Sequence, residues 1–292
     1  MIEIPTATAW ANVRYGRLLP LAARSRAFGT TYARVVSLAE WSLDSQRRQA
    51  ATARIGRWLR LRGLRAGALY RRCLESEARE EADTAWFMTH PYDELARACR
   101  GIDRPTSENA ATIWLTLHFG APILAYVYLC RWWGVDARIV GRTLDDGNPM
   151  PAAKRDWGRR KVAWVEEITG RPFLGVDAAS IARAREHLLH GGSLFAAVDV
   201  PGDVVGRSAD LDLFGESVRI AAGILRIAEL ERLPLRWLTA IPRGHEIDVR
   251  CGKAIPASPR AQQLAAIGCE MEAILRSHPE EWWLWPYLPS SR

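Results

Sequence analysis

The chain has 292 residues, of which 48% are hydrophobic and 25% charged, and its formal net charge is +7. This composition excludes a disordered or collagen-like chain, and the length allows a large core in one domain or in a domain with a helical extension. Arginine supplies nearly all of the positive charge, which favours anionic partners such as phospholipid head groups, a phosphorylated ligand or an acidic carrier protein.

The five cysteines are odd in number and scattered, and none has a Cys-x-x-Cys or Cys/His spacing. The sequence therefore predicts neither a metal site nor a disulfide framework, which fits a reducing compartment. No signal-peptide pattern is present at the N-terminus. The arginines are dispersed and no nucleic-acid-binding signature accompanies them, so we do not expect nucleic acid as a partner.

The first hundred residues read as helical. Residues 8–42 mix leucine and aromatic residues with arginines, which is typical of a segment that lies on an anionic membrane surface, or of a helical hairpin packed on its own domain. Residues 45–100 keep helical spacing of apolar positions and carry many charges, which fit a solvated face. We therefore divide the chain into a helical region, 1–100, and a core region, 101–292.

An uncharged run between Glu108 and Arg131 opens the core region. Residues 111–117 are rich in Ile, Trp, Leu and Thr, which predicts a buried strand. A turn at 119–121 precedes Pro122, which suits the first turn of a helix that ends before Gly134. A second short strand is expected over 135–141. This order describes a βαβ unit.

Further strands and helices alternate to the end of the chain, so we predict an α/β fold with a central, mostly parallel sheet flanked by helices. After a polar loop from 142, the expected elements are a helix over 162–169, a helix over 178–190, a strand over 194–199, a strand over 209–214, a helix over 218–232, strands over 235–241 and 246–251, and a helix over 259–277. The aromatic tail that follows is expected to dock on the body.

Two ionisable residues stand at the carboxyl ends of predicted strands, His118 after the first and Asp199 after the third. Ligands of open α/β sheets bind at those ends. A histidine there can act as a general base on a hydroxyl or amine. Alternatively, His118 is a core histidine bonded to backbone, and Asp199 caps the turn that follows it.

The order of several segments resembles a known family, the late acyltransferases of lipid A biosynthesis (the lauroyl and myristoyl transferases) and the related phosphatidylinositol mannoside acyltransferases. The segments cover about residues 10–286. They are an apolar strand running into His118-Phe-Gly120, an Asn148-Pro149 turn followed by Arg155 and Gly158-Arg159, the strand ending at Asp199, Asp212-Leu-Phe214-Gly215, residues 228–239, and the His278-Pro-Glu-Glu-Trp-Trp-Leu-Trp285 tail.

The resemblance implies a glycerolipid acyltransferase-like fold and a bacterial, membrane-associated enzyme. Such an enzyme moves an acyl chain from an acyl carrier protein or coenzyme A thioester to a hydroxyl or amine of a lipid or small-molecule acceptor, without a further cofactor. It would lie in the cytoplasm or peripherally on the cytoplasmic face of the inner membrane. By the same resemblance His118 is the general base, and Arg155 and Arg159 bind substrate. Gly120 either lets a backbone N–H approach the thioester oxygen or is only a turn glycine. The two arginines also fit a solvated helix face.

One position departs from the family pattern, which places an Asp or Glu five residues after the histidine. That position is Ile123 here. Three explanations stay open. Asp199, or else Asp145 or Asp146, orients His118 from another segment. His118 works alone. The chain is a non-catalytic relative that binds a lipid or acyl chain.

Overall fold

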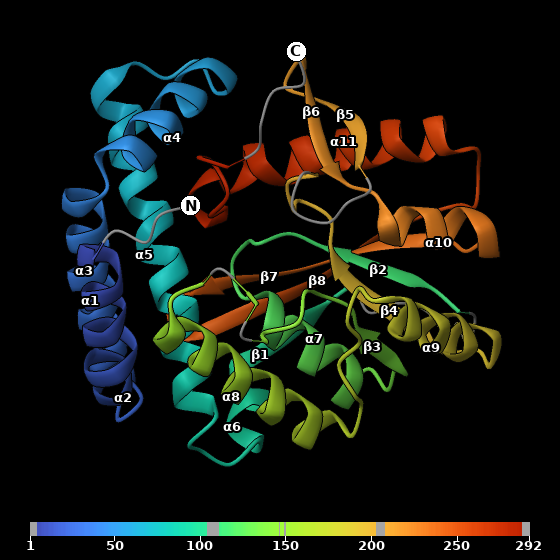
Figure 1. The fold of residues 1–292 in the computed structure, drawn as a ribbon, viewed down its shortest axis with the longest axis horizontal. Coiled ribbons are helices and arrows are strands. Elements are labelled where there is room, and N and C mark those ends of the chain that lie inside the picture. The colour runs from blue at the N-terminus through green and yellow to red at the C-terminus, as the bar shows by residue number, and fades with distance from the viewer. Residues whose placement is uncertain (1–4, 104–110, 146, 149, 203–207, 288–292) are drawn as a thin grey trace.

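The computed structural model describes residues 5–103, 111–145, 147–148, 150–202 and 208–287. The fold consists of a six-stranded sheet with helices packed around it, and six of the helices precede its strands in the sequence (Figure 1). Helices of the N-terminal half are α1 (Pro5–Val13), α2 (Leu19–Ala22), α3 (Arg26–Leu43), α4 (Ser45–Trp58), α5 (Gly63–Phe87) and α6 (Asp93–Ala98), with a π-helical turn, Arg14–Leu18, between the first two. The later helices are α7 (Pro122–Arg131), α8 (Ala152–Thr169), α9 (Ala178–Leu189), α10 (Gly223–Glu231) and α11 (Arg260–Ser277).

The sheet has the strand order β1-β8-β7-β2-β4-β3, and only its β7–β8 pair is antiparallel. Its strands are β1 (Cys99–Ile102), β2 (Ile113–Thr116), β3 (Ala137–Ile139), β4 (Ser193–Ala197), β7 (Leu235–Arg243) and β8 (Glu246–Ile255). The mostly parallel α/β architecture expected from the sequence is confirmed at this level. Because β2, β4 and β7 run in the same direction, their carboxyl ends meet at one edge of the sheet.

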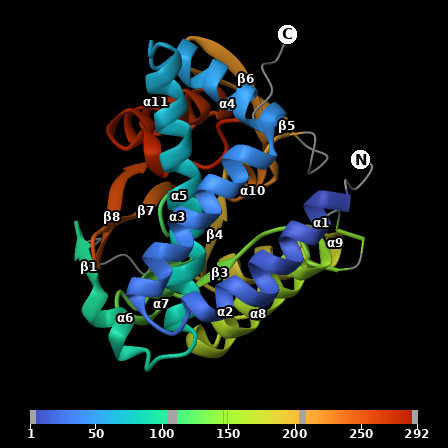
Figure 2. The same ribbon diagram turned by 90° about the vertical axis from the view of Figure 1, so that its left-hand side faces the viewer.

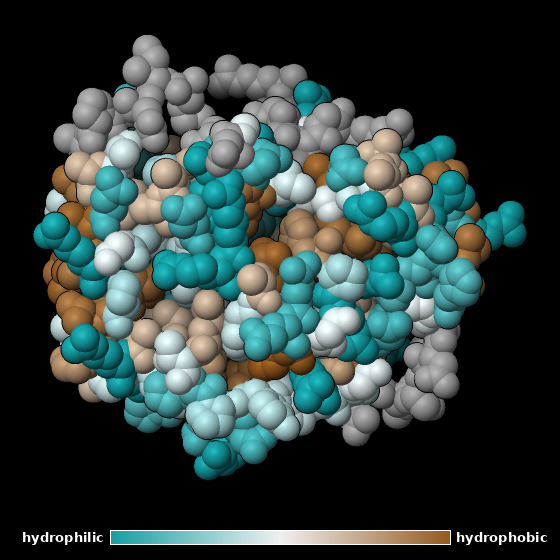
Figure 3. Space-filling model, turned by 60° about the horizontal axis from the view of Figure 1, so that its bottom comes forward, coloured by the Kyte–Doolittle hydropathy of each residue, from teal (hydrophilic) through white to brown (hydrophobic). Residues whose placement is uncertain are grey.

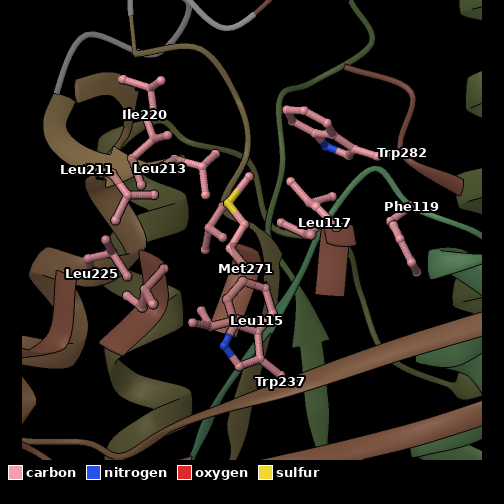
Figure 4. Packing of buried hydrophobic residues seen from close by; sticks show 14 of the residues in the cluster. Leu115, Leu117, Phe119, Leu211, Leu213, Ile220, Leu225, Trp237, Met271 and Trp282 are labelled. Carbon is pink, nitrogen blue, oxygen red and sulfur yellow. The ribbon is translucent and has the colours of Figure 1, made fainter. Parts of the chain in front are cut away.

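Each face of the sheet has its own hydrophobic core. On one face, β2 packs with α4, α5, α11 and a hairpin of β5 (Ser208–Leu213) and β6 (Glu216–Ala221). Figure 4 shows Leu115 of β2, and Leu117 just after it, beside Met271 of α11 and the hairpin residue Leu213. The other face packs on α6 and α7 and on Val165 of α8. The N-terminal helices thus share a core with the sheet.

Three predictions are wrong in part. Residues 99 and 100, assigned to the helical region, begin strand β1, because they pair with β8. Residues 216–221 form strand β6 and not the start of a helix over 218–232; the helix there is the shorter α10. Phe214 and Gly215 make a two-residue turn with φ of 55° and 77°, the geometry that joins two antiparallel strands. The helix expected over 162–169 begins earlier, at Ala152, directly after Pro151.

The helices α1, α2 and α3 form an outer layer over α5. Figure 2 shows them at the front of the molecule, with α8 beside α1 and α2. Their inner residues make a third apolar cluster, which includes Tyr15, Tyr32 and Val36 with Ala78 and Ala82 of α5. Its polar centre is Glu81, which accepts hydrogen bonds from Arg14, Tyr15 and Tyr32.

Candidate active site

His118 lies two residues beyond the end of β2, at the carboxyl edge of the sheet. The alternation of the strand continues past its end, so that Leu117 and Phe119 are buried in the core. The imidazole between them points the other way, and 39% of its side chain is exposed. The uncharged run therefore delivers one ionisable side chain to the surface of an otherwise apolar strand.

Asp199 is the cross-strand neighbour of His118. The pairing of β2 with β4 places Thr116 beside Ala197, and Val198 continues that pairing with a hydrogen bond to Thr116. One residue further along this ladder, the Asp199 carboxylate lies against His118. The register of two parallel strands thus brings a carboxylate to His118, although Ile123 carries none. Ile123 itself is half-buried on α7 and packs on the core of that face.

The Asp199 carboxylate is completely buried and accepts three hydrogen bonds. Its Oδ1 lies 2.8 Å from Nδ1 of His118. Its Oδ2 accepts from the backbone N–H of His118 at 2.7 Å and from the indole Nε1–H of Trp282 at 2.8 Å. A carboxylate can only accept, so Nδ1 carries the proton and Nε2 is left as the basic nitrogen. Among the described residues none forms a hydrogen bond with Nε2.

The electrostatic surroundings of His118 favour its protonated form. Partial burial disfavours the imidazolium, but the charge and hydrogen bond of Asp199 outweigh it, and the pKa of His118 is raised above 6.5. Glu77 of α5 also raises this pKa and Lys161 of α8 lowers it. Burial opposes ionisation of Glu77, but Arg47 and Lys154 lower its pKa to about 2. Glu77 is therefore a fixed negative charge and no proton carrier.

The C-terminal tail closes the back of the site. Trp283 donates its backbone N–H to the carbonyl of His118 at 3.0 Å, and its indole lies edge-on to the imidazole with the ring centroids 6.3 Å apart. Beside it, Glu281 is held by Ser76 and, at 2.9 Å, by Arg79 of α5. The tail thus docks on the body as expected, and it does so at the candidate site.

Gly120 has a structural part in this arrangement. Its φ is 59°, and a Cβ at this position would lie 2.0 Å from the carbonyl oxygen of Ala240, so only glycine fits. Its N–H donates to the carbonyl of Glu281 at 2.9 Å. The tail thus occupies the N–H of Gly120 itself, and a role for Gly120 in bringing a backbone N–H to a thioester oxygen stays a prediction.

Arg155 and Arg159 lie on α8 and hold the loop that precedes it. Arg155 donates to the carbonyls of Asn148 and Met150, both at 3.1 Å, and Arg159 to the carbonyl of Leu144 at 2.6 Å. Neither forms a hydrogen bond or ion pair with His118 or Asp199. A role for these two arginines in substrate binding stays a prediction.

The remaining acids considered for the site lie elsewhere or outside the described residues. Asp145 accepts hydrogen bonds from Thr143 at 2.7 Å and from the N–H of Gly147 at 3.0 Å, so it organises its own turn. Asp146 is outside the described residues. Sequence reasoning missed Trp282, whose indole holds the acid in place. The signal available for it was the aromatic density of the tail, which predicts docking but no particular partner.

Comparison with known proteins does not assign the chain to a family. No protein-family model matches the chain, and no curated protein matches it significantly. Within the described part of the chain, none of the helices combines the length and apolar character needed to cross a bilayer.

Proposed function

We propose that the chain transfers an acyl group from a thioester to a hydroxyl or amine, with His118 as the general base and Asp199 as its orienting acid. The observation that supports this is the His118–Asp199 pair at the carboxyl edge of the sheet, with 39% of the imidazole side chain exposed and no hydrogen bond to Nε2 from any described residue. A core histidine bonded to backbone would not keep its second nitrogen accessible beside a buried carboxylate.

The proposed reaction needs one proton carrier. Nε2 of His118 takes the proton from the acceptor O–H or N–H while the acceptor atom attacks the thioester carbonyl carbon. The C–S bond of the resulting tetrahedral intermediate then breaks. The thiolate leaves with the proton returned by the imidazolium, so that the base is regenerated. Asp199 keeps the proton on Nδ1 and stabilises the imidazolium, without itself taking the proton.

The donor is an acyl carrier protein or coenzyme A thioester, and the acceptor a lipid or small molecule. These follow from the family resemblance and from the net positive charge, since both donors are anionic. A non-catalytic lipid-binding protein is the competing proposal. The intact histidine–aspartate pair favours turnover, because binding alone would not require an oriented imidazole.

The activity should depend on pH through His118. Only the neutral imidazole can accept a proton, and its pKa is raised, so we expect the rate to fall as the pH falls through a midpoint above 6.5. The same shift makes His118 stabilise the fold at pH below 6.5, a contribution lost as the pH rises through the raised pKa. The measurement is kcat/KM against pH with thiol release as readout. A midpoint at or below 6.5 contradicts this assignment.

The outer helical layer offers a surface for an anionic membrane, at which we place the protein. Phe28, Val35 and Leu38 are exposed on one face of α3, because their spacings of seven and three residues return to the same side of a helix. Leu21 of α2 is exposed as well. Figure 3 shows hydrophobic surface on the left of the molecule, the side where Figure 1 places α1 to α3.

Charge on this layer matches an anionic surface. Arg17, Arg24 and Arg34 are exposed. The only acid in residues 8–43 is Glu40, which is largely buried and bound by Arg14 and Trp10. Exposed apolar residues interspersed with cations and free of exposed acids suit the interface of a bilayer that contains anionic lipid. This layer is one helix away from the site, because α3 packs on α5.

Vesicle flotation tests this surface. We expect the protein to float with vesicles of phosphatidylcholine and phosphatidylglycerol but not with phosphatidylcholine alone. The double variant Val35→Glu/Leu38→Glu should lose flotation, because it places two carboxylates in the apolar stripe. Leu189→Glu on α9, where the side chain is 75% exposed, is the matched control and should float like wild type. Equal flotation of all three proteins would reject the α3 surface.

A further inference from the structure

Three arginines converge on one buried carboxylate at the edge of the sheet that carries His118. Asp248 of β8 is buried, and its Oδ1 accepts from Arg100 of β1 through Nη2 at 2.8 Å and through Nε at 3.2 Å. Its Oδ2 lies 2.8 Å from Nε of Arg243 and 3.4 Å from Nη2 of Arg250. The three arginine side chains are 41–63% exposed.

This cluster holds more positive charge than its own acid balances. Asp248 stays ionised because the arginines, against the effect of its burial, lower its pKa. It neutralises one of three guanidinium charges. Glu246 acts on Arg100 and offsets a second, while Arg26 brings another cation by donating to the carbonyl of His245 in the same turn. Asp83 acts on Arg26 and Asp103 lies near Cys251, so the excess positive charge is confined to the three arginines and the one acid that they share.

Several guanidinium N–H groups of the cluster point to no acceptor within the described residues. Arg243 contacts Asp248 through Nε alone, so both of its Nη groups remain for a ligand. Asp248 fixes the orientation of all three side chains, which removes much of the entropy cost of ligand binding. Oriented guanidinium forks match the tetrahedral oxygens of a phosphate.

The cluster lies at the edge where the proposed chemistry takes place. Gly120 pairs with Ala240 of β7, and Arg243 follows three residues later on the same strand, which corresponds to ~10 Å. Strand β8 begins at this edge, because it runs antiparallel to β7. Strand β1 runs parallel to β8, so Arg100, near the start of β1, lies at this edge too. We infer that Arg100, Arg243 and Arg250, oriented by Asp248, form a binding site for a phosphate group of a ligand.

This inference goes beyond acyl transfer and is tested without turnover. The His118→Ala protein is titrated by calorimetry with inorganic phosphate, glycerol 3-phosphate, coenzyme A and dephospho-coenzyme A. We expect at least one of these probes to bind, and Arg243→Gln/Arg250→Gln to weaken that binding about tenfold or more, since each lost charged hydrogen bond has an effect of this size. Arg243→Gln alone serves if the double variant fails to fold.

The matched control is Arg219→Gln/Arg276→Gln, which removes the same charge from two half-exposed arginines paired with Asp210 and Glu272. It should bind like wild type. Preference for coenzyme A over its dephospho form, lost in the cluster variant, would identify the donor as the source of the phosphate. Binding of glycerol 3-phosphate would identify a phosphorylated acceptor. No binding of any probe at low millimolar concentration, or equal weakening in both double variants, overturns the site.

Discussion

Replacement of His118 by alanine is expected to lower acyl-transfer turnover by about a thousandfold, because proton abstraction from the acceptor is lost. The measurement is release of free thiol from acyl-carrier or acyl-coenzyme A substrate in the presence of a hydroxyl or amine acceptor. The fold should survive, because 39% of the imidazole is exposed and the core around it is apolar.

His190→Ala is the control for this experiment. His190 ends α9 on the surface, and its Nδ1 lies 2.8 Å from the carbonyl of Glu186. This variant removes a histidine without touching the site and should turn over like wild type. Full turnover of His118→Ala would exclude His118 as the base. Equal lipid binding by wild type and His118→Ala, with no thioester consumed by either, would favour the non-catalytic proposal.

Asp199→Asn is expected to lower turnover by a factor of about a hundred to ten thousand, through the tautomer of His118. Two fixed N–H donors, the backbone of His118 and the indole of Trp282, face the position of Oδ2. The asparagine oxygen must take that position to satisfy both donors. Its NH2 group then faces Nδ1 of His118, which has to become the acceptor. The proton moves to Nε2, and the basic nitrogen is lost.

The asparagine variant separates the explanations for the missing acid at Ile123. If His118 works alone, Asp199→Asn keeps nearly full turnover. Asp145→Asn is the matched control, because Asp145 serves only its own turn, and it should leave the rate unchanged. Nitrogen NMR of the imidazole gives a readout independent of rate: we expect the proton on Nδ1 in wild type and on Nε2 in Asp199→Asn. Retention of the Nδ1 proton in the variant would contradict the mechanism.

The fold was predictable where local chemistry and burial agree. The uncharged run, the Gly120 turn and Pro122 indicated a buried strand followed by a helix, and β2 and α7 occupy those residues. The hairpin was missed because its turn places Phe214 in the left-handed region, a conformation that phenylalanine rarely adopts and that its presence in a sequence does not predict. The strand after it alternates Val218 and Ile220 with polar residues over only six positions, too short to exclude a helix by pattern alone.

The candidate site was predictable in its parts but not in its assembly. The sequence placed His118 and Asp199 after two buried strands, and topology rules bring such ends to one edge. Which strands are neighbours, and in what register, depends on packing across the whole sheet. The contact between Asp199 and Trp282 joins residues from distant parts of the chain. The arginine cluster around Asp248 could not be predicted either, because its members come from three strands whose order in the sheet does not follow from the sequence.

The docking of the tail has a consequence for the order in which the molecule matures. A ribosome makes His118 and Asp199 long before Trp282, so the nascent chain holds its proposed base and acid while the third hydrogen bond to the carboxylate is still absent. Gly120, too, gains the partner of its N–H only when Glu281 arrives. The proposed pair thus gains its full set of contacts only when the tail docks, which is also when Trp282 and Trp285 join the core on that face of the sheet.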